Sequence, residues 1–429
     1  MWKYLRKLVI YRRINLMNRV FVTGMGAITP NAIGVEEFTT ALKNGVNGIS
    51  TTTAFDATDF TVKISGQVKN FNPDLYMDKK EARRHDRYTV FALSAAKMAA
   101  DQAKLTEKNF DVDRAGVLVS TGIGGIQFFE NEHKTYLEKG PSRVSPFLVP
   151  MMICNIASGC IAMQYGLHGP NYSIVSACAS SLHAIGEAYL KIAYGECDIM
   201  MCGGSEAALT PLTTAGFAKM KALSTRNDEP EKASRAFDKD RDGFVMGEGA
   251  GILVLESEES AMKRGSTILA EIKGYGASAD AHHLTAPHPE GFGAAKSVKS
   301  AIMRNNFPIE NIDYINAHGT STPLGDIAEM KALKQVFGEE GIKKPIVNAT
   351  KSMIGHLLGA AGAIGTIATV IQINNGFIHP NRNLDNVDPE LIGYNFAPNH
   401  FIEKQINAAL VDAFGFGGQN ACLLVTKVQ

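Results

Sequence analysis

Three side chains in this sequence are suited to nucleophilic chemistry: Cys178, His318 and His356. Cys178 stands where a short apolar strand is followed at once by an amphipathic helix. The free backbone N–H groups at the start of a helix favour a thiolate, lower its pKa and can also receive an oxyanion. The alternative for Cys178 is a buried structural cysteine, because free cysteine is among the most buried residue types.

The two histidines stand in segments made of small and hydroxyl-bearing residues. His318 directly follows an apolar strand, in the run Asn-Ala-His-Gly-Thr-Ser-Thr-Pro. His356 begins a helix that has almost no bulk on one face, which lets a ligand or another backbone come close. Each histidine taken alone could equally be a core residue whose ring bonds a backbone carbonyl.

An internal repeat would bring these three side chains together. Four segments of the first half correspond, in order, to four of the second: 21–27 to 271–277, 115–122 to 312–319, the strand-turn-helix of Cys178 to 346–356, and 244–255 to 414–425. The first pair reads as strands that end in a Gly-x-Gly-Ala turn. Because equivalent strand ends meet in related halves, we expect one site at the centre of the molecule.

The repeat predicts an α/β protein of two related halves, 17–266 and 267–429. The first half is longer, so it should carry cap insertions, for which 123–170 and 209–242 are the candidates. Apolar residues at helical spacing predict outer helices over 34–45, 80–105, 294–305 and 324–337.

Composition excludes several classes of protein. The 43 basic and 43 acidic side chains cancel, which gives no indication of a nucleic-acid or membrane-surface partner. No apolar run approaches the ~20 residues of a membrane-spanning helix. The six cysteines form no Cys-x-x-Cys pair and no zinc spacing, so we expect reduced thiols, a cytoplasmic location and no metal.

The first sixteen residues differ from the rest, with five basic residues and no acidic one. Met17 then begins what reads as a natural first strand. We expect 1–16 to lie outside the fold, as the product of an upstream start codon or a loosely attached extension. An organellar targeting segment, which would place the protein in an organelle matrix, and a membrane-surface arm are the alternatives.

Three segments resemble the signatures of the β-ketoacyl-acyl carrier protein synthases of the thiolase superfamily: Ser-Ala-Cys-Ala-Ser-Ser around Cys178, His-Gly-Thr-Ser-Thr-Pro-x-Gly-Asp from His318, and Lys-x-x-x-Gly-His-Leu-Leu-Gly from Lys351. Segments 237–251 and 414–418 resemble two more, and the likeness runs from about residue 19 to the end. Within the family the chain is most similar to the type II enzymes of fatty-acid elongation. The resemblance implies a thiolase-like fold in α-β-α-β-α layers, and a homodimer.

The resemblance also implies a decarboxylative Claisen condensation. An acyl chain would pass from the phosphopantetheine of an acyl carrier protein to Cys178, and malonyl on a second carrier would lose CO2 and attack it. His318 and His356 would donate N–H bonds to the enolate oxygen, with no metal or other cofactor. The backbone N–H groups of Cys178 and Phe416 would form the oxyanion hole.

Further residues take roles by resemblance alone. Lys351 would support the histidine side of the site, Thr320 and Thr322 would bind the pantetheine arm, Phe414 would contact substrate, Phe416 would be a mobile gate, and Ile123 would line the acyl tunnel on the dimer side. For Phe416 and Ile123 the alternative is core packing. The basic residues Lys79, Lys80, Arg83 and Arg84 are candidates for carrier docking.

The chain also departs from the family pattern. Gly365 stands where the family commonly has a Glu that pairs with the lysine, so Glu329 and Asp326 become the candidate partners of Lys351. Asp412 and the alanine after it replace the usual Asn-Ser. These changes leave room for a ketosynthase of a specialised polyketide or aryl polyene pathway.

Two other classes fit the sequence less well. A non-catalytic partner subunit that only sets chain length is expected to lack the nucleophile, whereas Cys178 is present. A degradative thiolase would need a second cysteine near the C-terminal glycine-rich turn. Cys422 lies instead within an apolar strand.

Overall fold

The computed structural model describes residues 17–106 and 108–428. The predicted extension 1–16 lies outside these residues. Within them, no helix is both long and apolar enough to cross a membrane.

One 11-stranded sheet runs through the molecule and consists of two five-stranded sets with the same topology and the short strand β2, which pairs with β1. In each set the first two pairings are antiparallel and the last two parallel. The first set is β1 (Val20–Thr29), β8 (Gly249–Ser257), β7 (Ile199–Glu206), β5 (Ala115–Ser120) and β6 (Asn171–Tyr172). The second set is β9 (Ala270–Ala279), β15 (Gln419–Thr426), β14 (Ala408–Gly415), β10 (Tyr314–Asn316) and β11 (Ile346–Asn348).

The two sets confirm the repeat predicted from the sequence. The matched segments lie on β1 and β9, on β5 and β10, and on β8 and β15, and the sets join where Val20–Val22 of β1 pairs with Ala270–Ile272 of β9. The boundary between the halves at 266/267 stays a prediction.

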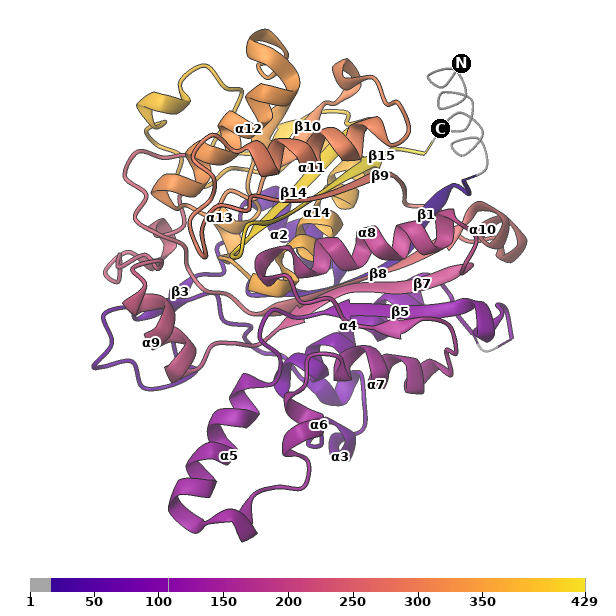
Figure 1. Ribbon diagram of the computed structural model, residues 1–429, viewed down its shortest axis with the longest axis vertical. Helices are drawn as coiled ribbons and strands as arrows, with labels where there is room; N and C mark the ends of the chain where they lie inside the picture. The colour runs from indigo at the N-terminus through magenta and orange to yellow at the C-terminus, as the bar shows by residue number, and fades with distance from the viewer. Residues whose placement is uncertain (1–16, 107, 429) are drawn as a thin grey trace.

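Helices and strands alternate in five layers, as predicted (Figure 1). Helices α4 (Arg87–Gln102) and α7 (Ile156–Tyr165) cover the first set of strands, and α11 (Phe292–Met303) and α12 (Pro323–Gly341, with a break at Gly338) cover the second. Between the sets lie α8 (Ser180–Ala193) and α14 (Ala361–Asn375), which contact each other and both sets.

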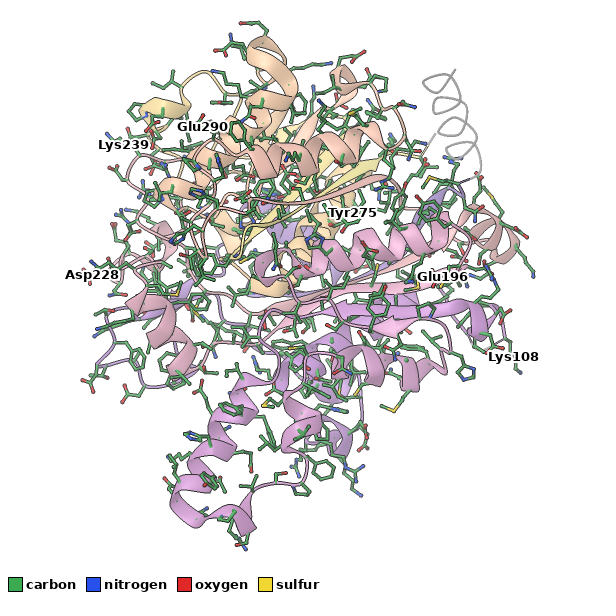
Figure 2. All side chains as sticks on the ribbon, in the orientation of Figure 1. Lys108, Glu196, Asp228, Lys239, Tyr275 and Glu290 are labelled. Atoms are coloured by element: carbon green, nitrogen blue, oxygen red, sulfur yellow. The ribbon has the colours of Figure 1, made fainter. Side chains whose placement is uncertain are left out.

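The middle layer forms because both helices are small and apolar enough to be enclosed. Helix α14 is buried from Ala361 to Ile373, as expected of a helix that is apolar all round. Gly186 of α8 lies so close to Tyr275 of β9 that a Cβ would be 2.2 Å from the ring. Figure 2 shows Tyr275 inside the molecule, whereas the labelled charged side chains lie at its periphery.

The two Gly-x-Gly segments lie inside strands β1 and β9, so the prediction that they end those strands in a turn was wrong. They are needed for close packing of the outer helices. A Cβ at Gly26 would lie 2.0 Å from the carbonyl oxygen of Ala95 in α4, and one at Gly276 would lie 2.0 Å from that of Ser297 in α11. The same device therefore fixes one outer helix in each half.

Of the four predicted outer helices, three form close to their predicted bounds: α2 (Val35–Asn44), α11 and α12. The region predicted as one helix over 80–105 is two, α3 (Lys79–Ala82) and α4. Asp86 separates them, because its extended backbone and its side chain, which accepts the N–H of Tyr88, cap the start of α4.

The two predicted insertions carry helices of their own. The first holds α5 (Ile126–Lys139), α6 (Leu148–Met152) and α7, and the second holds α9 (Pro211–Lys219). Helices α5 and α6 project from the layered body as an arm (Figure 1), and α5 has no buried residue. The remaining elements are β2 (Ala32–Ile33), β3 (Ser50–Thr51), β4 (Ile64–Ser65), α10 (Glu258–Arg264), α13 (Lys351–Ile354), β12 (Phe377–Ile378) and β13 (Ile402–Glu403).

Candidate active site

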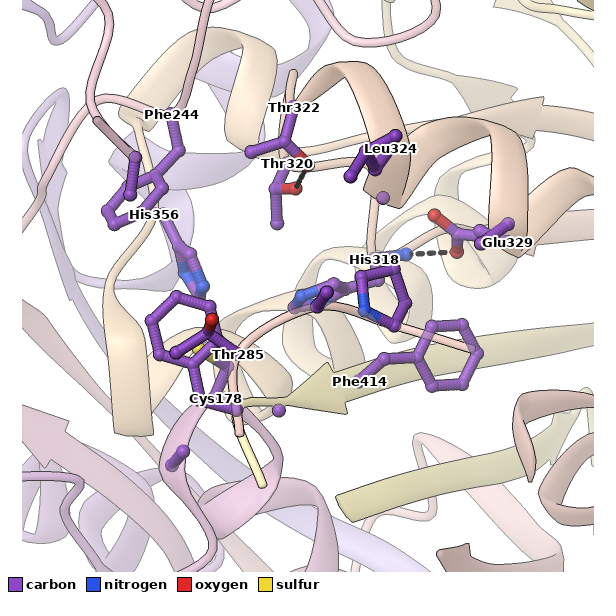
Figure 3. Close-up of a pocket in the computed structure, with 18 of the residues that line it drawn as sticks. Cys178, Phe244, Thr285, His318, Thr320, Thr322, Leu324, Glu329, His356 and Phe414 are labelled. Atoms are coloured by element: carbon purple, nitrogen blue, oxygen red, sulfur yellow. Dashed lines mark hydrogen bonds between the residues drawn. The ribbon is translucent and has the colours of Figure 1, made fainter. Parts of the chain in front are cut away.

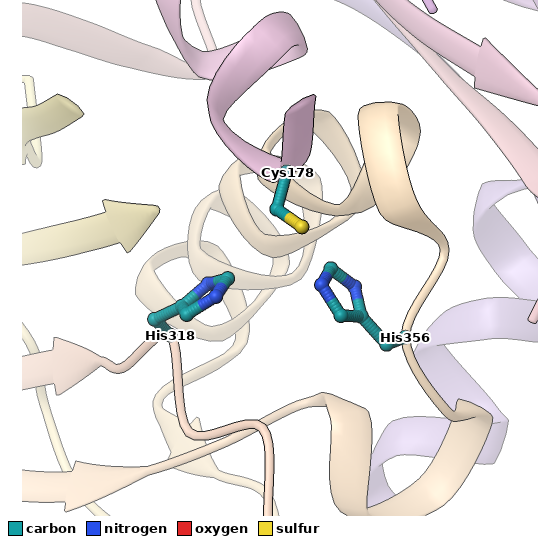
Figure 4. A group of neighbouring side chains, drawn as sticks. All are labelled: Cys178, His318 and His356. Atoms are coloured by element: carbon teal, nitrogen blue, oxygen red, sulfur yellow. The ribbon is translucent and has the colours of Figure 1, made fainter. Parts of the chain in front are cut away.

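Cys178, His318 and His356 meet at the centre of the molecule (Figure 4). One ligand atom of each lies within 4.8 Å of the others. The imidazole rings are 5.4 Å apart between centroids and nearly perpendicular, at 85°. The structure thus brings together the three side chains that the sequence singled out, each from a different stretch of chain.

Cys178 lies at the start of the central helix. It is the middle residue of a single 3₁₀ turn, Ala177–Ala179, that leads directly into α8. Ala177 has a φ of 51°, a left-handed conformation that is uncommon for a residue with a side chain. This sharp entry presents the thiol to the cavity, while strand β6 ends earlier, at Tyr172.

The surroundings of Cys178 act on its thiol in opposite directions. Burial raises the pKa of Cys178 to about 11, whereas the charge of Lys351 and the backbone N–H groups of Phe416 and of Cys178 itself lower it. The sequence predicted only that the helix terminus lowers the pKa of Cys178, and the effect of burial is larger. The group is therefore a thiol at neutral pH, and its proton must leave when the sulfur attacks.

His356 is held as a neutral ring with a defined donor. Its Nδ1 accepts the backbone N–H of Leu358 at 3.1 Å, so the proton is on Nε2. Nε2 is buried without a partner among the described residues, and the ring points toward Cys178 (Figure 4). Burial and the charge of Lys351 hold the pKa of His356 well below its usual range. The result is an unused N–H donor beside the thiol.

His318 is fixed through its backbone. It follows β10, and its N–H donates to Glu329 of α12 at 2.6 Å, while the N–H of Gly319 donates to the other carboxylate oxygen at 2.8 Å (Figure 3). Burial, Lys351 and His356 hold the pKa of His318 well below its usual range. Two neutral imidazoles therefore face the thiol.

Lys351, the first residue of α13, is buried next to this group. Burial lowers its pKa, and the charges of Glu329 and Asp326 oppose this lowering. Asp326 already forms an ion pair with Arg241 at 3.5 Å and accepts two backbone N–H groups. Both of its predicted carboxylate partners are thus engaged by other donors.

A single cavity of about 450 Å³ connects the catalytic side chains with the expected substrate residues. The hydroxyls of Thr320 and Thr322 lie 3.0 Å apart on one wall (Figure 3), and the ring of Phe414 is 5.8 Å from that of His318. All five residues expected to bind substrate or gate the pocket line it: Ile123, Thr320, Thr322, Phe414 and Phe416. The wall also contains apolar side chains that the sequence did not indicate, among them Phe217, Met220, Phe244 and Leu358.

Phe416 lies in the hairpin between β14 and β15. Gly417 and Gly418 follow it with φ values of 85° and 73°, a left-handed pair that makes the turn tight. Gly415 before it packs against the turn of Cys178, where a Cβ would be 2.7 Å from the carbonyl oxygen of Ser176. This close approach brings the N–H of Phe416 to the thiol.

Sequence reasoning missed Glu206, which supports the pocket from behind. At the end of β7, its buried carboxylate accepts the hydroxyl of Thr121 at 2.7 Å and the N–H groups of Gly122, Ile123 and Gly359 at 2.7, 3.2 and 2.9 Å. It thereby joins the turn that carries Ile123 to the 3₁₀ turn after His356. Its one signal in the sequence is an acidic residue at the end of an apolar strand.

Two domain families match this chain. Residues 17–261 match the beta-ketoacyl synthase N-terminal domain, and residues 269–385 match the beta-ketoacyl synthase C-terminal domain. The chain is 47% identical to a 3-oxoacyl-[acyl-carrier-protein] synthase 2 of Synechocystis, over 96% of this chain and 98% of the relative. It is 46% identical to the protein of that name from Vibrio cholerae, over 96% and 99%.

Solved ketosynthases share the fold. The ishigamide ketosynthase/chain length factor superposes with a TM-score of 0.90 at 35% identity, over 96% of this chain and 100% of that one. A type II polyketide ketosynthase, solved in complex with its acyl-carrier protein, gives 0.89 at 33% identity with the same coverage. With both domain families matched in order and relatives aligned over nearly their full length, this chain belongs to the beta-ketoacyl synthase family.

Proposed function

We propose that this protein is an acyltransferase that condenses malonyl-acyl carrier protein with an acyl group held on Cys178. The products are 3-oxoacyl-acyl carrier protein and CO2, in fatty-acid elongation. The observation that carries this proposal is the meeting of Cys178, His318 and His356 in one enclosed cavity. Full-length relatives named 3-oxoacyl-[acyl-carrier-protein] synthase 2 support the elongation pathway.

The first half-reaction is a thioester exchange. The thiol of Cys178 loses its proton, the sulfur attacks the acyl carbonyl carbon, and the carbonyl oxygen becomes an oxyanion. The backbone N–H groups of Cys178 and Phe416 already face the sulfur and would stabilise that oxyanion. The carbon–sulfur bond to the carrier's pantetheine then breaks, and this sulfur leaves with a proton as the free carrier thiol.

The second half-reaction makes the carbon–carbon bond. The thioester oxygen of malonyl accepts N–H bonds from His356 and His318, so the electron pair released with CO2 collects on an enolate rather than on a free carbanion. The enolate carbon attacks the acyl carbonyl, the bond to Cys178 breaks, and the departing thiolate takes up a proton from water to restore the thiol. Neutral imidazoles suit this role, because each can donate without first losing a charge.

The remaining site residues take roles along the same cavity. Thr320 and Thr322 would bind the pantetheine arm, Phe414 would contact it near His318, and Phe416 would close the acyl end. Ile123 would limit the acyl tunnel. Thr320 and Thr322 lie together on the wall next to Leu324, and Phe244 lies against the ring of His356 (Figure 3).

The partner we propose is an acyl carrier protein, as in the related ketosynthase complex. Four exposed basic side chains on α3 and just after it would bind the acidic carrier: Lys79, Lys80, Arg83 and Arg84. A homodimer, a cytoplasmic location and an enzyme that needs no metal also remain proposals. A thiol and two imidazoles are also the ligand types of a zinc site, so the activity assay should include metal analysis of the purified protein.

Condensation itself tests the function. The purified protein, malonyl-carrier protein and acyl-carrier primers from two to sixteen carbons should yield 3-oxoacyl-carrier protein two carbons longer, detected by mass spectrometry. A ketosynthase of a polyketide or polyene pathway is the second candidate, favoured by Gly365 and Asp412, which depart from the fatty-acid pattern. Such a ketosynthase would extend one primer repeatedly or would not accept saturated primers. No product from any primer would contradict both.

A further inference from the structure

Behind the catalytic side chains lies a group of buried charges from three elements. Lys351 begins α13, Glu329 lies on α12, and Asp412 lies on β14. All three side chains are buried. The charge of Asp412 acts on the pKa of both Lys351 and Glu329, so these groups are near neighbours.

Asp412 is the carboxylate in this group that lacks hydrogen bonds. Both of its oxygens are buried, and neither has a hydrogen-bond partner among the described residues. Its cross-strand neighbour is Cys422, whose thiol is only a weak donor. A buried carboxylate in this position is stable as an ion only if a cation faces it. Burial raises the pKa of Asp412 to about 7, and the thiol of Cys422 and the charge of Lys351 oppose this rise.

The other two carboxylates are engaged by strong donors. Glu329 accepts the backbone N–H groups of His318 and Gly319, and Asp326 accepts two backbone N–H groups and pairs with Arg241. None of these contacts involves Asp412. Of the three, Asp412 is the one whose oxygens accept no hydrogen bond among the described residues, so it can act on Lys351 only through its charge.

A small cavity lies between Asp412, Lys351 and Gly365. Its volume is about 10 Å³, room for about one water molecule. A Cβ built on Gly365 would make only ordinary contacts, the nearest being Cγ1 of Val411 at 3.4 Å. Position 365 on α14 and position 412 on β14 thus face the same lysine from two sides, and a carboxylate on either could reach it.

We propose that Asp412 is a positioning residue, which supplies from β14 a carboxylate charge that faces Lys351 across this small cavity and favours its charged form beside the thiol. This inference rests on the proposed function.

The consequence for chemistry runs through Lys351. The charge of Lys351 lowers the pKa of Cys178, His318 and His356. Removing the negative charge of Asp412 makes the charged form of Lys351 less stable. The charge of Lys351 then lowers the pKa of the Cys178 thiol by less. Its pKa then rises, and acylation of Cys178 should require a higher pH. The other titratable groups that face Lys351 and Asp412 are Glu329, Asp326 and Cys422.

The test moves the negative charge from position 412 to position 365, on the other side of the small cavity. Asp412→Asn should lower kcat for condensation about tenfold, the effect of about one pKa unit, with little change in KM for the acyl carrier. It should also shift the pH profile of Cys178 acylation upward. Adding Gly365→Glu to Asp412→Asn should restore most of the rate and the profile. Adding Gly365→Gln, of matched size without charge, should not.

Each other outcome overturns the proposal. These are a wild-type rate for Asp412→Asn, equal rescue by Glu and Gln, or rescue by neither. If Asp412→Asn does not fold, Asp412→Ser takes its place in the same comparison, with thermal unfolding measured for every variant. The wild-type assay separates the two claims: a wild-type protein that condenses while the Glu rescue fails contradicts this role of Asp412 alone, and one that never condenses contradicts the proposed function.

Discussion

At the scale of single residues, the site depends on keeping two imidazoles neutral. Both rings are buried and lie near the charge of Lys351, and both effects oppose protonation. A histidine in water would be partly charged near neutral pH and would donate and release protons freely. Under the proposed function, each neutral ring would donate to an enolate oxygen over the whole physiological pH range.

We therefore predict separate effects for the histidines and the thiol. His356→Ala should lower malonyl decarboxylation on the order of 100-fold, the usual effect of losing one donor to a developing oxyanion. It should leave acylation of Cys178 within a fewfold of wild type. Release of CO2 from malonyl-carrier protein measures the first, and mass spectrometry measures the second. The exposed His168→Ala serves as control, and unchanged decarboxylation in His356→Ala would contradict the assignment.

The sequence predicted that the three side chains of the candidate site meet, but it did not indicate what supports them. Cys178, His318 and His356 stand in recognisable segments, and the repeat predicted that they meet. Nothing local shows that Asp412 would be buried without donors, or that Asp326 would be taken by Arg241. Those facts depend on which elements pack together. The net direction of the pKa of Cys178 was misjudged for the same reason, because burial is a property of the folded molecule.

At the scale of elements, the pocket is held by connections between turns. Glu206 ends β7 and ties the turn after β5 to the turn after His356. Close packing at Gly26 and Gly276 fixes the outer helices in the same way in both halves. Sequence patterns predicted the strands and most helices but placed these glycines in turns, since no local pattern shows how near a helix approaches a strand.

Replacement of Glu206 should be costly. Glu206→Ala leaves three backbone N–H groups and a hydroxyl without their acceptor, and we expect a loss of about 3 kcal/mol in the free energy of unfolding. Urea denaturation measures this, with the exposed Glu196→Ala as control, for which a change within about 0.5 kcal/mol is expected. A Glu206→Ala protein as stable as the control would show that the carboxylate does not hold these turns together.

At the scale of the whole molecule, two similar halves enclose α8 and α14 and thereby bury the site. The arm of α5 and α6 does not take part in this core. Its exposed apolar side chains include Leu137, at 69% exposure, together with Phe147 and Val149. Apolar surface of this kind marks an interaction site. The arm therefore supports the proposed homodimer.

We predict that Leu137→Glu weakens the dimer. A buried unpaired charge at a subunit contact is strongly unfavourable, so sedimentation should show a shift toward monomer at micromolar concentration. Ile392→Glu changes a residue of similar exposure, 74%, far along the chain and outside the arm, and should leave the mass unchanged. A wild-type protein that sediments as a monomer would contradict the homodimer directly.

The central claim is that Cys178 carries the acyl group in a cavity it shares with two histidines. Incubation with a long-chain acyl-carrier protein, followed by digestion and mass spectrometry, tests it most directly. We predict the acyl mass on the peptide of Cys178, and predict that Cys178→Gln loses both the label and condensation but still releases CO2 from malonyl. Acyl mass on another cysteine such as Cys154, or condensation without an acylated Cys178, would contradict the account.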